Sequence, residues 1–230
     1  MTENEQTGKT RVAALLIATA LALRPDNAED DTEEDEIRPR RVLAVTHSNG
    51  AADVLLQALL NIGLPAVRAG RAANVSPSLQ HRTIAALSEK MPEVIRLRQR
   101  ATDTSLEHDE RQSSLYDARQ CQDEAQTVIA RSSQVVVASC IGAAQLMSSI
   151  GTTEDDAPAF DLVVLDEAGQ TTEPALISAL TASKANQVVL IGDSEYLRFC
   201  VSASSSTLTR IFENLQQNNY RQRSRPRTPS

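Results

Sequence analysis

The sequence predicts an α/β domain built on a parallel sheet with helices on both faces. Four short apolar runs are rich in β-branched residues, helical segments lie between them, and only 3% of the residues are aromatic. Continuous apolarity, in place of alternation, indicates strands that are covered on both faces. Strands alternating with helices are typical of a doubly wound α/β fold.

Each predicted strand ends in a polar residue. The four strands are Val42–Thr46, Val135–Ser139, Leu162–Asp166 and Val188–Asp193. In parallel α/β sheets, ligands bind beyond the carboxyl ends of the strands. These polar residues are therefore the first candidates for a functional site.

Three helices are predicted from composition and from their end signals. Pro25 follows the first, Gly63 follows the second, and Pro174 lies in the first turn of the third, where proline is favourable. The predicted helices are Thr10–Leu23, Ala51–Asn61 and Glu173–Ala182.

The segment Ser76–Arg131 departs from this alternation because it is long, charged and nearly free of glycine. Apolar and small residues recur at helical spacing from Leu115 to Ile129. We expect two antiparallel helices that project from the sheet and turn near Thr102–Ser105. A disordered insertion is the alternative, since the segment is highly charged.

The net charge of −7 is local. Seven acidic residues form a run at 29–36, within a predicted loop at 26–37, and the remaining 23 acidic residues balance the 23 lysines and arginines. The acidic pI is therefore no argument against nucleic-acid partners. Residues 1–217 are expected to form one domain, and the polar, basic residues 218–230 a disordered tail.

Cysteine usage and hydropathy favour an intracellular protein, cytoplasmic or nuclear. Cys121, Cys140 and Cys200 are odd in number and far apart, so no disulfide framework or zinc site follows. The apolar stretch Val12–Leu23 imitates the core of a signal peptide but is too short to span a bilayer. No membrane association is expected.

Asp166 and Glu167 follow an apolar strand directly. Such a pair suits metal-dependent nucleotide hydrolysis, because one carboxylate can hold Mg²⁺ while the next activates the attacking water. An incidental turn after a strand is the alternative reading.

Thr7-Gly8-Lys9-Thr10 precedes an Ala/Leu-rich helix and matches the second half of a phosphate-binding loop. In such a loop the lysine contacts the β- and γ-phosphates, the threonine hydroxyl binds Mg²⁺, and the helix N-terminus adds its dipole. The full signature needs glycine at position 3, which is Glu3 here, so an ordinary helix start is the alternative. Asp193, after Gly192 at the last strand, completes the order of motifs that a P-loop ATPase requires, and it could sense the γ-phosphate.

These motifs together resemble the superfamily 1B helicases of the senataxin and nonsense-mediated-decay type. Residues 166–175 resemble motif II of that family, 42–56 motif Ia, 135–142 motif Ib and 189–201 motif III. The resemblance covers about residues 7–215 and implies the first RecA-like domain of such a motor. It also implies that the charged segment is a helical stalk at about 76–131.

The resemblance assigns roles to individual residues. Glu167, Asp166 and Lys9 would be catalytic, and Thr10 and Asp166 would hold Mg²⁺. Thr7, Gly8, Lys9, Thr10, Gln170 and Asp193 would bind ATP. Thr46, Ser48, Asn49, Ser139 and Cys140 would lie near the backbone of single-stranded RNA or DNA, where small polar groups can bind phosphates without reading bases. Capping of a helix is the alternative role for Ser48 and Asn49.

Three departures from the family pattern lead to one further expectation. Glu3-Asn4-Glu5-Gln6 replaces a Gly-Pro-Pro-Gly run, Tyr196 replaces a glutamine, and no second RecA-like domain follows in the sequence. Arginine fingers from such a domain can contribute about 10³-fold or more to phosphoryl transfer. We therefore expect a shortened chain whose own ATP hydrolysis is near background.

The leading hypothesis is the ATP-binding domain of an ATP-dependent helicase. ATP, Mg²⁺ and single-stranded RNA or DNA are its expected ligands, and other subunits of an RNA-processing or decay complex are possible partners. The main alternative is a catalytically inactive scaffold module that binds nucleotide or RNA. A GTPase is disfavoured, because no guanine-reading Asn/Thr-Lys-x-Asp stretch is present.

Overall fold

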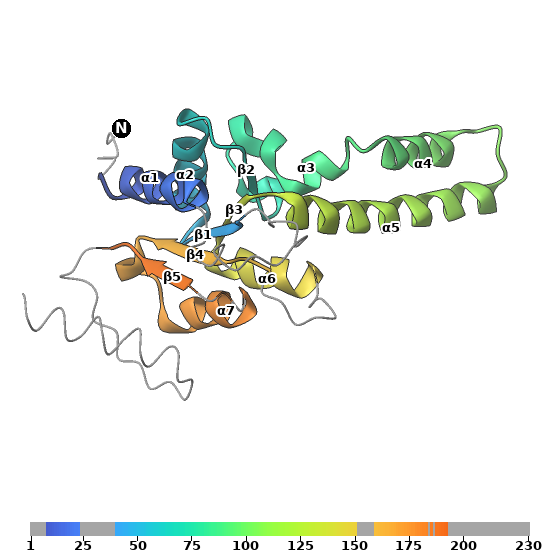
Figure 1. The fold of residues 1–230 in the computed structure, drawn as a ribbon. Helices are drawn as coiled ribbons and strands as arrows, with labels where there is room; N and C mark the ends of the chain where they lie inside the picture. The colour runs from blue at the N-terminus through green and yellow to red at the C-terminus, as the bar shows by residue number, and fades with distance from the viewer. Residues whose placement is uncertain (1–7, 24–39, 151–158, 184, 186, 193–230) are drawn as a thin grey trace, which may run out of the picture.

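The computed structural model describes residues 8–23, 40–150, 159–183, 185 and 187–192. Within them lies a five-stranded, wholly parallel sheet in the order β2-β3-β1-β4-β5 (Figure 1). The strands are β1 Val42–Thr46, β2 Ala66–Arg68, β3 Val135–Ser139, β4 Leu162–Asp166 and β5 Gln187–Leu190. The predicted fold class is confirmed.

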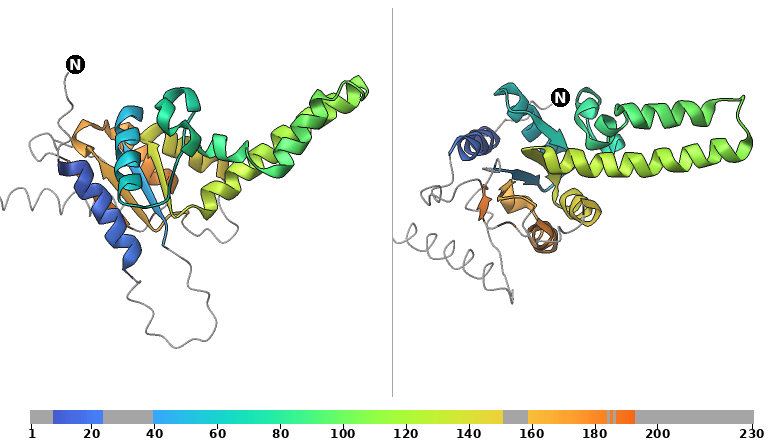
Figure 2. Two further views of the ribbon diagram at one scale, coloured as in Figure 1. Left: turned by 90° about the horizontal axis from the view of Figure 1, so that it is seen from above. Right: turned by 45° about the vertical axis from the view of Figure 1, so that its right-hand side comes forward.

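Helices cover both faces of this sheet (Figure 2). The first face packs against α1 (Gly8–Ala22) and α2 (Asn49–Asn61), whose Ile17 and Leu55 are fully buried. The second face packs against α6 (Cys140–Ile150) and α7 (Glu173–Ser183). Successive residues of β1, β3 and β4 belong to alternate clusters, as expected when side chains point to opposite faces of a strand. This double covering explains why the strands carry no polar face.

The register of the three central strands brings their last residues level. Thr46 of β1 pairs with Ser139 of β3 on one side and with Asp166 of β4 on the other. Ser139, Thr46 and Asp166 therefore lie side by side at the carboxyl end of the sheet.

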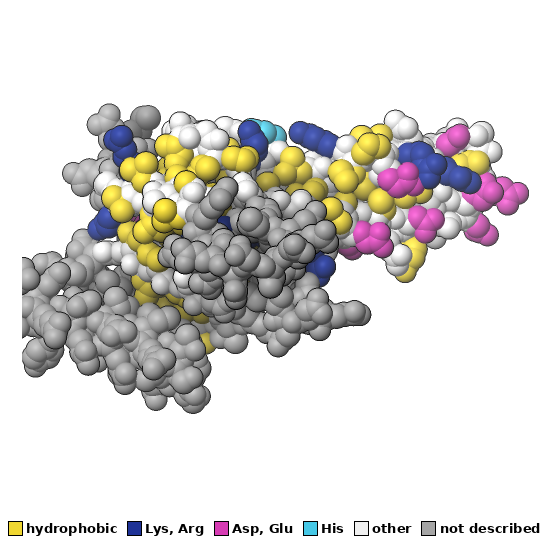
Figure 3. Space-filling model, viewed as in Figure 1, with side chains coloured by type: hydrophobic (Ala, Val, Ile, Leu, Met, Phe, Trp, Pro, Cys, Tyr) yellow, Lys and Arg dark blue, Asp and Glu magenta, His cyan; other side chains and the backbone are white. Residues whose placement is uncertain are grey.

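The charged insertion forms a helical hairpin that projects from the domain (Figures 1 and 2). It consists of α4 (Pro92–Thr102) and α5 (His108–Ser132), which run antiparallel and are reached through the short helix α3 (Ile84–Ser88). Val94 and Ala118 are buried within this region, and Arg98 donates to Gln122 across the pair (2.7 Å). Figure 3 shows acidic and basic side chains together over its outer part. The stalk is thus an ordered hairpin with a mixed-charge surface.

Arg41 ties together three segments at the opposite edge of the sheet, before β1. Its guanidinium donates to the carbonyl oxygens of Ala130 (2.5 Å), Ser133 (3.3 Å) and Ala159 (2.6 Å), and it lies 4.6 Å from the centre of the Phe160 ring. The side chain is buried. Arg41 therefore fixes the end of α5 against the approach to β4.

The helices and strands expected from the sequence lie close to the observed ones. The structure also contains β2, α3 and α6, which were not predicted, and its last strand ends at Leu190, before Asp193. Three 3₁₀ turns were also not expected: η1 Ala72–Asn74, η2 Pro77–Arg82 and η3 Ala168–Gln170. The acidic loop (26–37) and the basic tail (218–230) lie outside the described residues. None of the described helices is long and apolar enough to cross a membrane.

Candidate functional site

Asp166 is the last residue of β4, and its two carboxylate oxygens have separate partners. Oδ2 accepts a hydrogen bond from the hydroxyl of Thr10 (2.8 Å), and Oδ1 accepts from the backbone N–H of Glu167 (2.9 Å). The side chain is 2% exposed. The contact with Thr10 joins residues 156 apart in sequence, so the first turn of α1 lies against the end of β4.

Gly8, Lys9 and Thr10 form the first turn of α1, where the N–H groups of a helix have no partners within the helix. Gly8 is exposed, and Lys9 and Thr10 are half-buried. The N-terminus of a helix attracts phosphate through the N–H groups of its first turn and through its dipole. The adjoining hydroxyl and carboxylate oxygens are hard donors that suit Mg²⁺, which usually keeps several of its waters. These residues fit both ligands. Thr7 lies outside the described residues.

Glu167 has a left-handed backbone, with φ of 55° and ψ of 41°. It is the one non-glycine residue with positive φ in the described part of the chain. Such a conformation costs of order 1–3 kcal/mol and is concentrated at functional sites. It turns the chain sharply after β4, so that the side chain of Glu167 remains partly exposed beside Asp166.

His47, directly after β1, contacts the side chain of Glu167. Its Nδ1 lies 3.0 Å from Oε2 of Glu167, and both side chains are about one-quarter exposed. The two atoms are close, but they are not aligned as a hydrogen bond. The pair is a polar contact between His47, directly after β1, and Glu167, directly after β4.

Gly192 brings the chain after β5 against the turn that contains Glu167. Ile191 donates to Leu165 and accepts from Ala168, both at 2.8 Å. A Cβ at Gly192 would come within 3.1 Å of the backbone nitrogen of Gly169, so a side chain would not fit without a shift. Gln170 ends η3 and is exposed at this turn. Asp193, the proposed γ-phosphate sensor, lies outside the described residues.

Ser48 and Asn49 begin α2, and Ser139 ends β3 on the same edge of the sheet. The hydroxyl of Ser48 caps α2 by accepting from the N–H of Ala51 (3.2 Å). The hydroxyl of Ser139 accepts from the N–H of Gly142 in the first turn of α6 (3.2 Å). The side chains of Ser48, Asn49 and Ser139 are half-buried, so this edge of the sheet offers polar groups that a nucleic-acid strand could reach.

Thr46 and Cys140 require a correction. Thr46 is 0% exposed and donates to the carbonyl of Ser48 (2.8 Å), and Cys140 is 1% exposed within the core. Burial raises the pKa of the Cys140 thiol to about 11. Neither side chain can reach a nucleic-acid strand bound at the surface. We therefore remove both residues from the proposed nucleic-acid contacts. The sequence could not show this, because a polar residue at a strand end is usually accessible.

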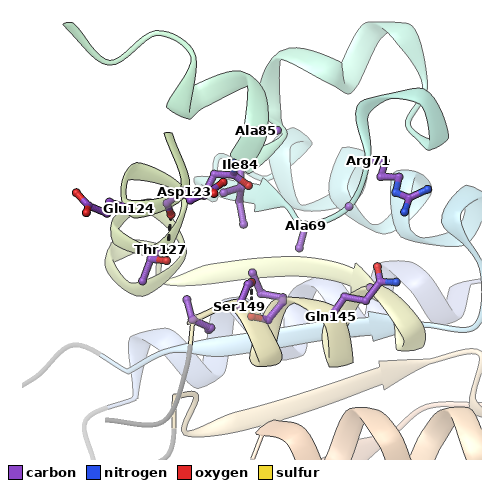
Figure 4. A pocket seen from close by; sticks show the side chains of 14 residues that line it. Ala69, Arg71, Ile84, Ala85, Asp123, Glu124, Thr127, Gln145 and Ser149 are labelled. Carbon is purple, nitrogen blue, oxygen red and sulfur yellow. Dashed lines mark hydrogen bonds between the residues drawn. The ribbon is translucent and has the colours of Figure 1, made fainter. Parts of the chain in front are cut away.

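A cavity of about 660 Å³ opens between α6 and the base of the stalk. Figure 4 shows Gln145 and Ser149 of α6 facing Ile84 and the α5 residues Asp123 and Thr127. Gly142 forms part of its wall. The lining mixes apolar, acidic, basic, hydroxyl and amide groups, so its chemistry selects no single class of ligand.

The sequence reading missed three residues of this region: His47, Asp53 and Arg68. Asp53 and Arg68 form an ion pair with 3.2 Å between Oδ1 and Nε, and both side chains are buried. Arg68 lies at the end of the strand that was not predicted. The one available signal was Asp53 at a position of α2 otherwise surrounded by apolar residues, because a buried carboxylate requires a partner.

Comparison with known protein families finds a match to part of the chain. Residues 93–201 match the model of the AAA domain family. The matched region covers somewhat less than half of the chain and includes Asp166 and Glu167. No curated protein matches the sequence. Together with the parallel sheet and its helical layers, the match supports a P-loop ATPase domain of the helicase type.

Proposed function

We propose that this chain is the ATP-binding domain of a superfamily 1B helicase, which binds Mg²⁺-ATP and single-stranded RNA or DNA. The observation that carries the proposal is the hydrogen bond between Thr10 and Asp166. It brings a helix N-terminus suited to phosphate together with a carboxylate at a strand end, which neither sequence motif could show by itself.

The positions of the described residues support the roles that the resemblance assigns. Lys9 and the first turn of α1 would bind the phosphates, and Thr10 and Asp166 would hold Mg²⁺. The bound ion would neutralise charge on the β- and γ-phosphates. Glu167, partly exposed beside Asp166, would orient and deprotonate the attacking water. Gln170, exposed on the same turn, and Asp193 would contact the nucleotide.

Ser48, Asn49 and Ser139 would bind the sugar-phosphate backbone. Ser48 and Asn49 begin the helix that follows β1, the neighbour of β4, and Ser139 ends β3, on the other side of β1. The two ligands would therefore share one edge of the sheet. The contact of His47 with Glu167 supports communication between the nucleotide site and the nucleic-acid site. Hydroxyl and amide groups recognise phosphate without base identity.

Binding of a fluorescent ATP analogue, with and without Mg²⁺, tests the proposal. We expect saturable, Mg²⁺-strengthened binding that Lys9→Ala weakens, and a thermal shift with Mg²⁺-ATP. Glu167→Gln serves as the control variant, because it should still bind nucleotide. If Mg²⁺-ATP gives no thermal shift and Lys9→Ala changes nothing, the chain is a scaffold and not a nucleotide-binding motor domain.

A further inference from the structure

Arg68 and Asn49 make a contact that determines which side of the Asn49 amide is presented to a ligand. Nη2 of Arg68 donates a hydrogen bond to Oδ1 of Asn49 (3.0 Å). A guanidinium carries donors only, so the amide oxygen must face Arg68. The orientation of this asparagine follows from chemistry and does not depend on distinguishing oxygen from nitrogen.

The amide nitrogen of Asn49 must then point away from Arg68. Among the residues that the structure describes, no acceptor is recorded for this nitrogen, and the side chain is half-buried. An NH₂ group offers two donors, and a phosphate diester offers only acceptors in its ionised form. The outward face of Asn49 is therefore complementary to phosphate, whereas the flipped amide would oppose it.

Arg68 is itself held in place from several sides. Its Nε lies 3.2 Å from Oδ1 of Asp53, and its Nη1 donates to the carbonyl oxygen of Ala69. Asp53 also accepts from the N–H (2.7 Å) and the hydroxyl (2.8 Å) of Ser76. Gly70 follows at φ of 138°, a backbone conformation that favours glycine, and a Cβ there would be in ordinary contact with Nη1 of Arg68, at 3.4 Å.

This support keeps the guanidinium rigid and charged. The side chain of Arg68 is 1% exposed. Burial lowers the pKa of Arg68, and the hydrogen bond and charge of Asp53 oppose that change. An arginine remains protonated in proteins at ordinary pH. The donor that orients Asn49 is thus always present.

We propose that Arg68 is a positioning residue for nucleic-acid binding: it orients the Asn49 amide so that its NH₂ group meets a backbone phosphate of a single strand. The proposal rests on the nucleic-acid binding proposed above and names the group that makes the contact. Arg68 would not touch the strand. It would act through Asn49 alone.

A purely structural role for the pair, anchoring β2 to α2, is the competing explanation. The variant Asp53→Leu/Arg68→Met separates the two. It removes both charges at once, so it leaves the net charge of the chain unchanged, and apolar replacement of a buried ion pair is often neutral or stabilising. Ser76, the other partner of Asp53, is exposed and can bond to water.

The experiment measures binding of labelled oligouridine and oligothymidine at low salt by fluorescence anisotropy, after thermal melting has shown that each variant is folded. We expect Asn49→Ala to weaken binding about tenfold, as for loss of one hydrogen bond to a charged group. Asn49→Asp should weaken it more, because a carboxylate would then face the phosphate. Asp53→Leu/Arg68→Met should match Asn49→Ala, and Asn49→Ala added to it should cause no further loss.

The same variants overturn the proposal if Asn49→Ala weakens binding equally in both backgrounds, since additivity means that Arg68 does not act through Asn49. A second readout is the side-chain NH₂ resonance of Asn49, which should shift on adding oligonucleotide in the wild type and not in Asp53→Leu/Arg68→Met. If the wild type binds but Asn49→Ala binds equally well, this proposal fails and the proposed function stands. If the wild type binds neither oligonucleotide, the nucleic-acid part of the proposed function fails, and this proposal with it.

Discussion

The hydroxyl of Thr10 lies 2.8 Å from Oδ2 of Asp166 and donates a hydrogen bond to it, across 156 residues of sequence. The two proposed Mg²⁺ ligands are therefore held side by side by this hydrogen bond. Their hydroxyl and carboxylate oxygens are the hard donors that would bind Mg²⁺.

Thr10→Val removes the hydroxyl and keeps the shape of the side chain. We expect the strengthening of ATP-analogue binding by Mg²⁺ to fall at least about tenfold, since one bond to a charged group is worth about 1.5–3 kcal/mol. Binding in EDTA should be unchanged. Thr10→Ser is the matched control and should retain the effect of Mg²⁺. Equal loss with and without metal would contradict the assignment of Thr10 as a metal ligand.

Glu167→Asn should raise stability while abolishing any hydrolysis that depends on Glu167. Asparagine tolerates the left-handed conformation better than glutamate, and we expect a gain of up to about 1 kcal/mol in the free energy of unfolding. Urea denaturation measures it. Glu124→Asn, in the middle of α5, is the control and should lose a few tenths of a kcal/mol, about the difference in helix propensity. Similar losses at both positions would show that Glu167 is not strained.

Gly192→Ala should destabilise the domain by about 1–3 kcal/mol, because its Cβ would press against the backbone nitrogens of Ala168 and Gly169, at 3.3 and 3.1 Å. Nucleotide affinity should fall too, since the same turn carries Glu167. Gly50→Ala in α2 has open space around it and should be neutral or slightly stabilising. Chemical denaturation and analogue binding of the two variants form the comparison.

Cys140 should resist alkylation in the folded protein. Its pKa is raised to about 11, so the reactive thiolate is scarce below about pH 9, and the side chain is buried. In a Cys200→Ser background, iodoacetamide at pH 8 followed by mass spectrometry should modify the half-buried Cys121 and leave Cys140 intact until denaturant is added. Rapid modification of native Cys140 would place it near the surface, where a nucleic-acid contact would again be open to it.

Arg41→Ala should lower the free energy of unfolding by about 2–4 kcal/mol, because three carbonyl oxygens lose a charged donor. Arg96→Ala on the exposed surface of α4 is the matched control and should change stability by less than about 1 kcal/mol. Nucleotide binding should survive in both, measured well below the melting temperature. A loss of binding in Arg41→Ala at a temperature where it is folded would show that this end of the sheet reaches the site.

The strands and the long helices were predictable because their hydrophobic patterns are local. Leu162–Asp166 reads as a buried strand with a polar end, and the structure confirms it. The three-residue strand Ala66–Arg68 could not be recognised, since it is short and ends in a charged residue whose partners lie on α2. Helix α6 begins directly after β3, without a loop between them, so no turn residues marked its start.

The site was predictable to the level of motifs but not of contacts. Asp166 and Glu167 are adjacent in sequence, so their role could be read together. The pairs Thr10–Asp166, His47–Glu167 and Asn49–Arg68 join different elements and depend on the strand order, which the sequence does not specify. Burial decides the rest: Ser139 and Cys140 are neighbours, yet only the first is accessible.

Ser139, Thr46 and Asp166 lie at the same level of the sheet. This register limits the insertions and deletions that such a domain can tolerate. Adjacent strands lie about 4.8 Å apart, so the proposed nucleic-acid and nucleotide contacts are separated by the width of one or two strands. Inserting or deleting a single residue in any of these strands would reverse the facing of its side chains and misalign both ligands at once. Change in length can therefore be tolerated only in the connections, and the longest of the described ones, from β2 to β3, holds the stalk.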